Sequence, residues 1–141
     1  MADHAPVFGY ELLRDILLPD LLGKDTREIS YWAGKSLARK FPLLSTDEVI
    51  SFFLEAGWGS LRLVEERRNE IKLELGGRIV KRRLEMVQDP CFRLEAGFLA
   101  EQFQNRNEAI TEAHDEIIKK THKVTFTVRW DKKDGAGSAT M

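Results

Sequence analysis

The sequence is poor in the residues that usually hold metals and disulfides. It has one cysteine, Cys91, and three histidines among 141 residues. One thiol cannot form an internal disulfide, and thiolate zinc sites normally need two or more cysteines. Of the histidines, His4, His114 and His122, the last two lie eight residues apart, which is not the helical spacing of a ligand pair. We therefore expect no metal and no cofactor.

An excess of charge of one sign is also lacking. Lys and Arg total 22 and Asp and Glu total 23, so the net charge is −1. Nucleic-acid-binding domains usually carry a basic excess, so we expect no nucleic-acid partner. The basic residues between 67 and 83 have glutamates among them and are interpreted as a solvated face. No Walker loop, Gly-x-Gly-x-x-Gly, Gly-x-Ser-x-Gly or His-Glu-x-x-His motif occurs, so those nucleotide and hydrolase classes lose their main support.

Long apolar runs are absent as well. No stretch approaches the roughly 20 residues that span a bilayer, and the first residues contain no apolar signal region. These features predict a cytoplasmic protein without a membrane span. The composition, 43% hydrophobic and 32% charged, is typical of one globular domain. We expect a flexible lead over 1–8, a single domain over 9–131 and a disordered tail over 132–141.

Helical periodicity dominates the first part of the chain. A helix beginning near Tyr10 is expected to end at Pro19. A second helix is expected from residue 25 or 26 to 41, and its polar arc is so narrow that it predicts a central helix covered on more than one side. The segment Ser45-Thr46-Asp47-Glu48 has the spacing of a capping box, which predicts a third helix over 46–56.

The rest of the chain mixes alternation with helical spacing. Residues 61–65 and 71–75 alternate around a polar turn and predict a β-hairpin. Helices are expected over 79–87 and 91–104, and strict alternation over 124–130 predicts a strand.

Residues 108–118 fit either a short helix or a partner strand for that last segment. Strands grouped together rather than alternating with helices favour one α+β domain, with an antiparallel sheet covered by helices on one face.

Two residues of the expected 91–104 helix are candidate functional groups. Glu95 lies between two apolar faces, and burial there would favour its protonated form and suit it to proton transfer. The alternative is that Glu95 faces solvent, as an ordinary solvated carboxylate, or a subunit interface. Cys91 is expected in the first turn, where the helix dipole favours a thiolate nucleophile, although a lone cysteine is more often a small core residue. No histidine is placed to complete a catalytic dyad.

The aromatic residues are open to two interpretations. They either fill the core or line an apolar ligand cavity between the helices and the sheet. The residues assigned to such a ligand-binding cavity are Trp32, Gly34, Phe53, Trp58, Cys91, Glu95 and Phe98.

Three blocks of sequence have a distinctive spacing, and two shorter ones flank them. They are Tyr31-Trp32-Ala33-Gly34-Lys35 with Leu37-Ala38-Arg39-Lys40-Phe41-Pro42, Phe53 with Glu55-Ala56-Gly57-Trp58-Gly59, and Pro90-Cys91-Phe92 with Leu94-Glu95-Ala96-Gly97-Phe98, between Leu18-Pro19-Asp20 and Val128-Arg129-Trp130-Asp131. With this spacing the chain resembles the YslB-like family of small uncharacterised proteins from Bacillus-type bacteria, over roughly residues 9–131.

That family is similar in turn to a fold shared by 4-vinyl reductase domains, TRAPP-type tethering subunits and haem-based nitric-oxide sensors. The resemblance implies that 108–118 is a strand paired with 123–130. The fold would then be α+β, with about four strands in the order helices, hairpin, helices, hairpin, and the protein a homodimer. No cofactor is implied, because the histidines are poorly placed for haem and no cysteines lie near the last strands. TRAPP-type subunits can carry a fatty acyl chain on a helical cysteine, and Cys91 is also expected on a helix, but the resemblance does not align the two positions.

Three functional hypotheses follow. The first is a non-enzymatic homodimer that binds an apolar small molecule or an acyl chain. The second is a protein–protein adaptor without a ligand cavity, which an exposed apolar patch would favour. The third is an enzyme using Cys91 and Glu95, which requires both side chains to converge on one pocket.

Overall fold

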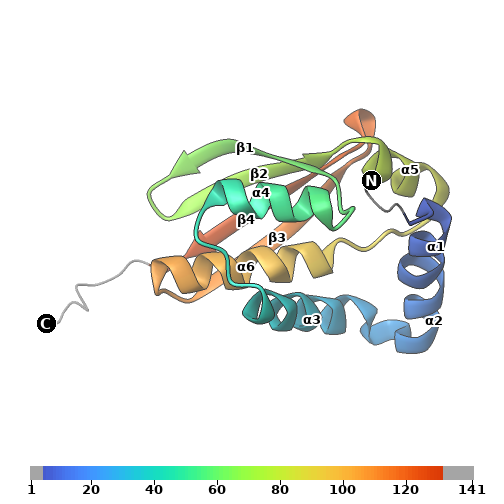
Figure 1. The fold of residues 1–141 in the computed structure, drawn as a ribbon, viewed down its shortest axis with the longest axis horizontal. Coiled ribbons are helices and arrows are strands. Elements are labelled where there is room, and N and C mark those ends of the chain that lie inside the picture. The colour runs from blue at the N-terminus through green and yellow to red at the C-terminus, as the bar shows by residue number, and fades with distance from the viewer. Residues whose placement is uncertain (1–4, 132–141) are drawn as a thin grey trace, which may run out of the picture.

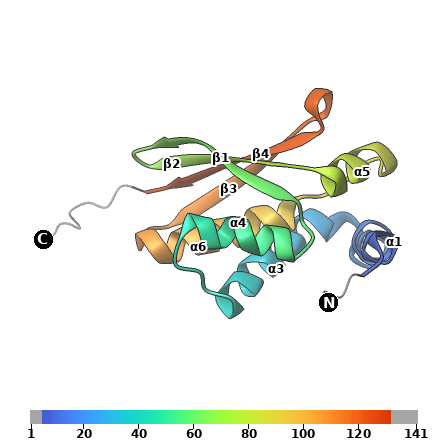
Figure 2. The ribbon, with the colours of Figure 1, turned by 45° about the horizontal axis from the view of Figure 1, so that its top comes forward.

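Two β-hairpins form a four-stranded antiparallel sheet, and helices cover one of its faces (Figure 1, Figure 2). The computed structural model describes residues 5–131 of the chain. The first four residues of the expected lead and the tail expected over 132–141 lie outside the described residues, whereas Val7 and Phe8 belong to a helix. The architecture is the expected one, a single α+β domain with the order helices, hairpin, helices, hairpin.

The sheet has the strand order β1-β2-β4-β3. The hairpins meet where β2 lies beside β4, and Leu73 is opposite Phe126 there. Alternation turns these side chains toward the helices, and both are fully buried. The register of β1 shifts between Leu63 and Glu65, which marks a β-bulge. The strands are β1 (Ser60–Arg67), β2 (Glu70–Gly76), β3 (Thr111–Ile118) and β4 (Lys123–Trp130). The segment 108–118 thus contains the strand that the family resemblance implied.

Helix α6 is the central helix of the fold, because it contacts β3 and β4 on one side and α3 on the other (Figure 2). The prediction that α3 holds this place is wrong. Its narrow polar arc arises from small residues together with an outward aromatic: Gly34 and Ala38 are buried, but Trp32 is 59% exposed. The main helices are α3 (Thr26–Lys40), α4 (Thr46–Glu55), α5 (Arg78–Met86) and α6 (Arg93–Asn107).

Two glycines allow α3 and α6 to approach closely. A Cβ on Gly34 would lie 2.1 Å from the backbone oxygen of Leu94, and one on Gly97 would lie 2.0 Å from that of Tyr31. Each helix therefore occupies a notch in the other, and no larger residue fits at either position.

The capping box before α4 is confirmed. The Ser45 hydroxyl accepts a hydrogen bond from the backbone N–H of Glu48, and the Glu48 carboxylate accepts one from the backbone N–H of Leu44. The helix ends before Gly57, whose φ of +75° suits a residue without a side chain.

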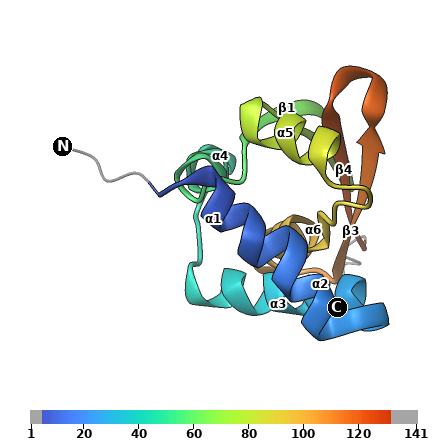
Figure 3. The same ribbon diagram turned by 90° about the vertical axis from the view of Figure 1, so that its right-hand side faces the viewer.

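A helical segment over residues 7–22, here called the arm, crosses one end of the layers (Figure 3). It consists of α1 (Val7–Glu11), a π-helical turn (Leu12–Leu17) and α2 (Leu18–Leu22), and a 3₁₀ turn (Gly23–Asp25) joins it to α3. The prediction that a helix ends at Pro19 is wrong. The proline lies in the first turn of α2, directly after the π-helical turn, and the helical backbone continues through it.

Candidate functional site

Three residues assigned to the predicted cavity pack against one another in the core. The ring centroids of Phe53 and Trp58 are 4.9 Å apart, and that of Phe98 lies 5.3 Å from Trp58 and 6.0 Å from Phe53. Phe52 stacks on Phe98 at 4.6 Å. These contacts agree with the interpretation in which the aromatic residues fill the core.

The structure places Gly34 against the backbone of Phe98 in α6, whereas Trp32 lies apart from this aromatic group. Trp32 projects from α3 beside the Lys35 ammonium, which lies 5.4 Å from its ring centroid. Gly34 faces α6 at the helix crossing. Trp32 therefore lies on the outward side of α3, and Gly34 lies on the inward side that packs against α6.

Cys91 and Glu95 lie in a third place, near the arm. The prediction of Cys91 in the first turn of a helix is wrong, because α6 begins at Arg93 and Cys91 precedes it. Glu95 is fully buried, so the interpretation of a solvated carboxylate is also wrong. The seven predicted residues are therefore divided among three places.

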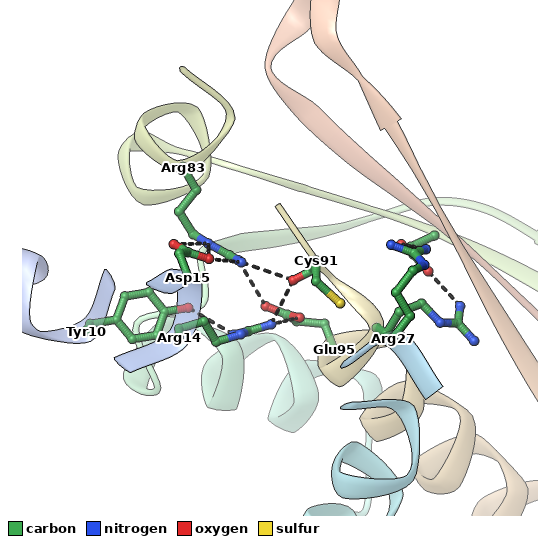
Figure 4. A network of polar contacts seen from close by, with 9 residues as sticks. Tyr10, Arg14, Asp15, Arg27, Arg83, Cys91 and Glu95 are labelled. Carbon is green, nitrogen blue, oxygen red and sulfur yellow. Dashed lines mark hydrogen bonds and ion pairs between the residues drawn. The ribbon is translucent and has the colours of Figure 1, made fainter. Parts of the chain in front are cut away.

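Glu95 belongs to a buried group of four charged side chains, here called the charge cluster: Arg14, Asp15, Arg83 and Glu95 (Figure 4). They come from the arm, from α5 and from α6. Arg14 Nη2 lies 2.5 Å from Glu95 Oε1, and Arg83 Nη2 lies 2.7 Å from Asp15 Oδ1. Both arginines also donate to the backbone oxygen of Cys91, at 3.2 and 3.0 Å. The cluster ties three elements to the loop before α6.

Two cations and two anions make the charge cluster neutral. Burial by itself would lower the pKa of Arg14, but the nearby Glu95 carboxylate outweighs it, and the pKa stands above its usual value. Burial raises the pKa of Tyr10, whose hydroxyl accepts a hydrogen bond from Arg14 at 3.0 Å. Glu95 is thus held by an arginine that stays charged, an arrangement suited to holding the arm in place.

Two atoms of the cluster have unused bonding capacity. Arg83 Nη1 and Glu95 Oε2 are buried and have no hydrogen-bond partner among the described residues, and they face one another at 3.8 Å. Arg83 also lies over the Phe92 ring, 4.3 Å from its centroid, so its guanidinium is fixed from two sides.

A pocket of about 490 Å³ opens beside the cluster, with walls from the arm, the start of α3 and the loop 87–91; it is here called the Cys91 pocket. Arg14, Lys24 and Arg27 contribute basic side chains to its lining. Figure 4 shows the Cys91 sulfur on the side of Arg27 rather than of Arg83. Cys91 therefore lines this pocket, while Glu95 belongs to the cluster behind it.

Asp115 on β3 links the pocket to the sheet. It pairs with Arg93 at 2.6 Å and with Arg27 at 3.6 Å. The Arg93 guanidinium lies 4.3 Å from the centroid of the Tyr31 ring. Arg27 is 57% exposed, so its head group remains accessible from the pocket.

Sequence reasoning missed Arg14 and Asp15, and its interpretation of Arg83 as part of a solvated basic face is wrong, because Arg83 is fully buried. A signal was present for the first two, since Glu11, Arg14 and Asp15 recur at helical spacing and define a charged face. For Arg83 the signal is its place three residues after buried Val80, on the inner side of α5. Nothing local shows that these two faces meet.

Over residues 5–131 there is no group of three or more His, Cys, Asp and Glu side chains placed to hold a metal ion. Within the same residues, no helix combines the length and the apolar character needed to cross a membrane.

The fold is shared with several solved structures. A vinyl-4-reductase family protein from Methanocaldococcus jannaschii aligns with a TM-score of 0.63 at 18% identity, covering 93% of this chain and 85% of that one. The phenol-responsive sensory domain of the transcription activator PoxR, with phenol, aligns at 0.62 and 10% identity, covering 96% and 81%.

Two further structures are of the kinds that the sequence resemblance pointed to. An H-NOX protein from K. algicida aligns at 0.53 and 13% identity, covering 93% of this chain and 76% of that one. A trafficking protein particle complex subunit 3 from Naegleria fowleri, covalently bound to palmitic acid, aligns at 0.51 and 9% identity, covering 89% of each. At these identities the likeness establishes the fold alone.

Within this fold the sequence places the chain more narrowly. Residues 7–129 match the family described as "Protein of unknown function (DUF2507)". The protein YslB of Bacillus subtilis (strain 168) is 51% identical over 127 residues, which cover 90% of this chain and 86% of YslB. The chain belongs to the DUF2507 family, and the resemblance found in the sequence blocks is confirmed.

Proposed function

We propose that the protein is a non-enzymatic, cytoplasmic homodimer that binds a small molecule with an apolar body or acyl chain and an acidic group, in the Cys91 pocket. The pocket carries the proposal. Its volume of about 490 Å³ falls in the range of roughly 300–1,000 Å³ that is typical of small-molecule sites.

The charges of the pocket favour an acidic group on the ligand. Asp15 is paired with Arg83 and Arg14 with Glu95, which leaves the bases Lys24 and Arg27 and the acid Asp89 in the lining. Arg27 is only loosely paired, at 3.6 Å from Asp115, and its head group is exposed. Apolar side chains such as Val87 complete the wall and suit the body of the ligand. A carboxylate placed near Arg27 would gain a charge-assisted hydrogen bond.

Two structural neighbours support a ligand-binding role. The PoxR domain is described with phenol, and the trafficking-complex subunit with covalently bound palmitic acid. Both hold molecules with a large apolar part on this fold. An enzyme using Cys91 and Glu95 has less support, because Glu95 lies in the charge cluster, paired with Arg14.

Thermal stabilisation by matched compounds tests the proposal. Octanoic acid and phenylacetic acid should raise Tm, with a stabilisation of about 2.7 kcal/mol at a concentration of 100 times Kd. Octanol and phenylethanol, which are of similar size, should raise Tm less at the same concentration. Arg27→Gln should remove the preference for the acids. Arg62→Gln, on exposed β1 away from the pocket, serves as the control. Equal responses to acids and alcohols, or a full response in Arg27→Gln, would contradict the proposed site.

A second candidate function is a protein–protein adaptor, favoured by the exposed apolar side chains of the arm. It requires a different chain on that surface. The pure protein would then be monomeric and would bind none of the compounds, which separates this candidate from the first.

A further inference from the structure

The arm turns its polar side toward the core and its apolar side toward solvent. Glu11 is its buried residue, and Arg14 and Asp15 point inward to the charge cluster. Eight large apolar side chains of the arm are between 37% and 69% exposed: Val7, Phe8, Leu12, Leu13, Ile16, Leu17, Leu18 and Leu21. This is the reverse of an ordinary surface helix, whose apolar stripe faces the core.

We propose that the outward face of the arm is the surface on which a second copy of this chain packs. The inference rests on the homodimer in the proposed function and names its interface. In Figure 3 the arm lies at the front, and none of the other helices and strands within residues 5–131 lies in front of it. Monomeric proteins rarely expose contiguous apolar patches larger than a few hundred Å². A set of eight large exposed apolar side chains therefore indicates that another molecule packs on this face.

Ion pairs explain how the arm keeps this orientation. Besides the pairs of Arg14 and Asp15, Glu11 lies 2.6 Å from Arg82 of α5. Three inward-facing charged side chains of the arm thus form ion pairs with α5 and α6. These ion pairs hold the arm on the core while most of its leucines remain exposed. The apolar face is left available for contact with another molecule.

The charge of the arm disfavours a lipid surface as the occupant. Helices that lie on anionic membranes carry lysines and arginines on their polar side. The arm has no lysine, and its single base, Arg14, is paired inward with Glu95. Its outward face therefore offers an anionic lipid surface no basic side chain, whereas contact with an apolar protein surface needs none.

A second copy fits the face in size and symmetry. In a two-fold contact the same patch is used twice, and an apolar patch is complementary to itself without any pairing of charges. Sixteen helical residues extend about 24 Å, long enough for two arms to pack side by side in opposite directions. A standard interface needs each partner to bury about 800 Å², and eight large side chains supply the apolar centre of such an area.

Sedimentation equilibrium of the full chain tests the interface. The wild type should be a dimer, and Leu13→Glu and Leu17→Glu should each weaken dimerisation by roughly 100-fold or more, as central interface residues do. Leu44→Glu is the matched control. Leu44 is 84% exposed between α3 and α4, away from the arm, and its variant should remain dimeric.

A cysteine variant keeps the test valid if a glutamate variant fails to fold. In a Cys91→Ser background, Leu13→Cys should form a disulfide-linked dimer on mild oxidation, and Leu44→Cys should not. Circular dichroism and Tm of each variant report on folding. Cross-linking at Leu44 but not at Leu13 would overturn the interface.

The outcomes separate this inference from the proposed function. A monomeric wild type would overturn both the interface and the homodimer. A dimer that both arm variants leave intact would overturn the interface alone. Flotation of a monomeric wild type with phosphatidylglycerol vesicles would overturn the second copy in favour of lipid. The shift in Tm of Leu13→Glu on adding octanoic acid tests the Cys91 pocket separately, whichever of these three outcomes is found.

Discussion

The arm and helix α6 both depart from the usual placement of polar and apolar residues, but in opposite directions. In α6 the nine residues from Glu95 to Phe103 are all buried, polar ones included. In the arm, the charged side chains of Glu11, Arg14 and Asp15 face inward and most of the leucines face outward. The buried polar groups of α6 find partners on outer segments, and the arm supplies the partner of Glu95.

The comparison teaches that polar contacts position the outer segments of this protein. Gln102 donates to the backbone oxygen of Phe41 and accepts from the backbone N–H of Leu43, which fixes the end of α3 on α6. Arg39 of α3 lies 3.5 Å from Glu101 in the same way. Because buried polar groups are costly without partners, each such contact specifies one docking geometry.

The largest effect is expected where α6 has no room. Gly97→Val would place a Cβ 2.0 Å from the Tyr31 backbone oxygen, so α3 must move away. We expect a loss of at least about 4 kcal/mol, or no folding, in urea denaturation. The control is Gly9→Ala in the arm, where nothing lies within 4 Å and the residue is helical. That change should stabilise by roughly 0.5–1 kcal/mol. Similar losses in both variants would show that the crossing is not tightly packed.

A smaller but still large effect is expected from the ion pairs between the two regions. Glu95→Gln leaves Arg14 and Arg83 with Asp15 as the sole anion of the charge cluster. Removing one partner of a buried pair costs about 3–5 kcal/mol, and limited proteolysis should then cut the arm faster. The exposed Glu28→Gln removes the same charge from α3 and should change stability by less than about 0.5 kcal/mol. Equal stability of the two variants would refute this view of the arm.

The smallest effect is expected from Tyr10→Phe, measured as a function of pH. Burial raises the pKa of Tyr10 in the folded protein, so the folded state holds the neutral phenol while the unfolded chain ionises near pH 10. The stability of the wild type should therefore fall as pH rises above about 10, and the stability of Tyr10→Phe should fall less. At pH 7 the variant should lose about 1 kcal/mol with its hydrogen bond to Arg14.

Tyr31→Phe is the control for this titration. It also removes a hydrogen bond, the one that its hydroxyl accepts from the Ala113 N–H, but it retains Tyr10. Because Tyr10 is still present, the stability of Tyr31→Phe above pH 10 should decline more steeply than that of Tyr10→Phe in Tm measurements. A decline in Tyr10→Phe as steep as in the control would rule out the buried phenol as its cause.

Local signals predicted the fold well. The alternation of 124–130 and the capping box at Ser45 depend on neighbours in sequence, and the structure contains both features. Residues 108–118 needed family resemblance, because Ile110, Ala113 and Ile117 also fit helical spacing. The sequence analysis mistook α3 for the central helix because hydrophobicity alone does not distinguish a small buried face from an exposed apolar one.

The charge cluster was beyond such reasoning. Arg14 and Glu95 are separated by 81 residues, and their pairing depends on how the arm crosses the layers. The helical projection did suggest that Glu95 is buried between two apolar faces. However, a carboxylate without a known partner is more often solvated. The partner that changes this balance is visible only in the folded chain.

The bulge in β1 bears on how copies of this protein can meet. The sheet has two open edges, β1 and β3, whose unpaired backbone groups offer a template for joining sheets end to end. The bulge between Leu63 and Glu65 breaks the regular hydrogen-bonding pattern of the first edge, and exposed Glu112 and Glu116 set like charges along the second. Edge-to-edge growth into fibrils is thereby discouraged at both ends, so a crowded solution of this chain should stay free of amyloid.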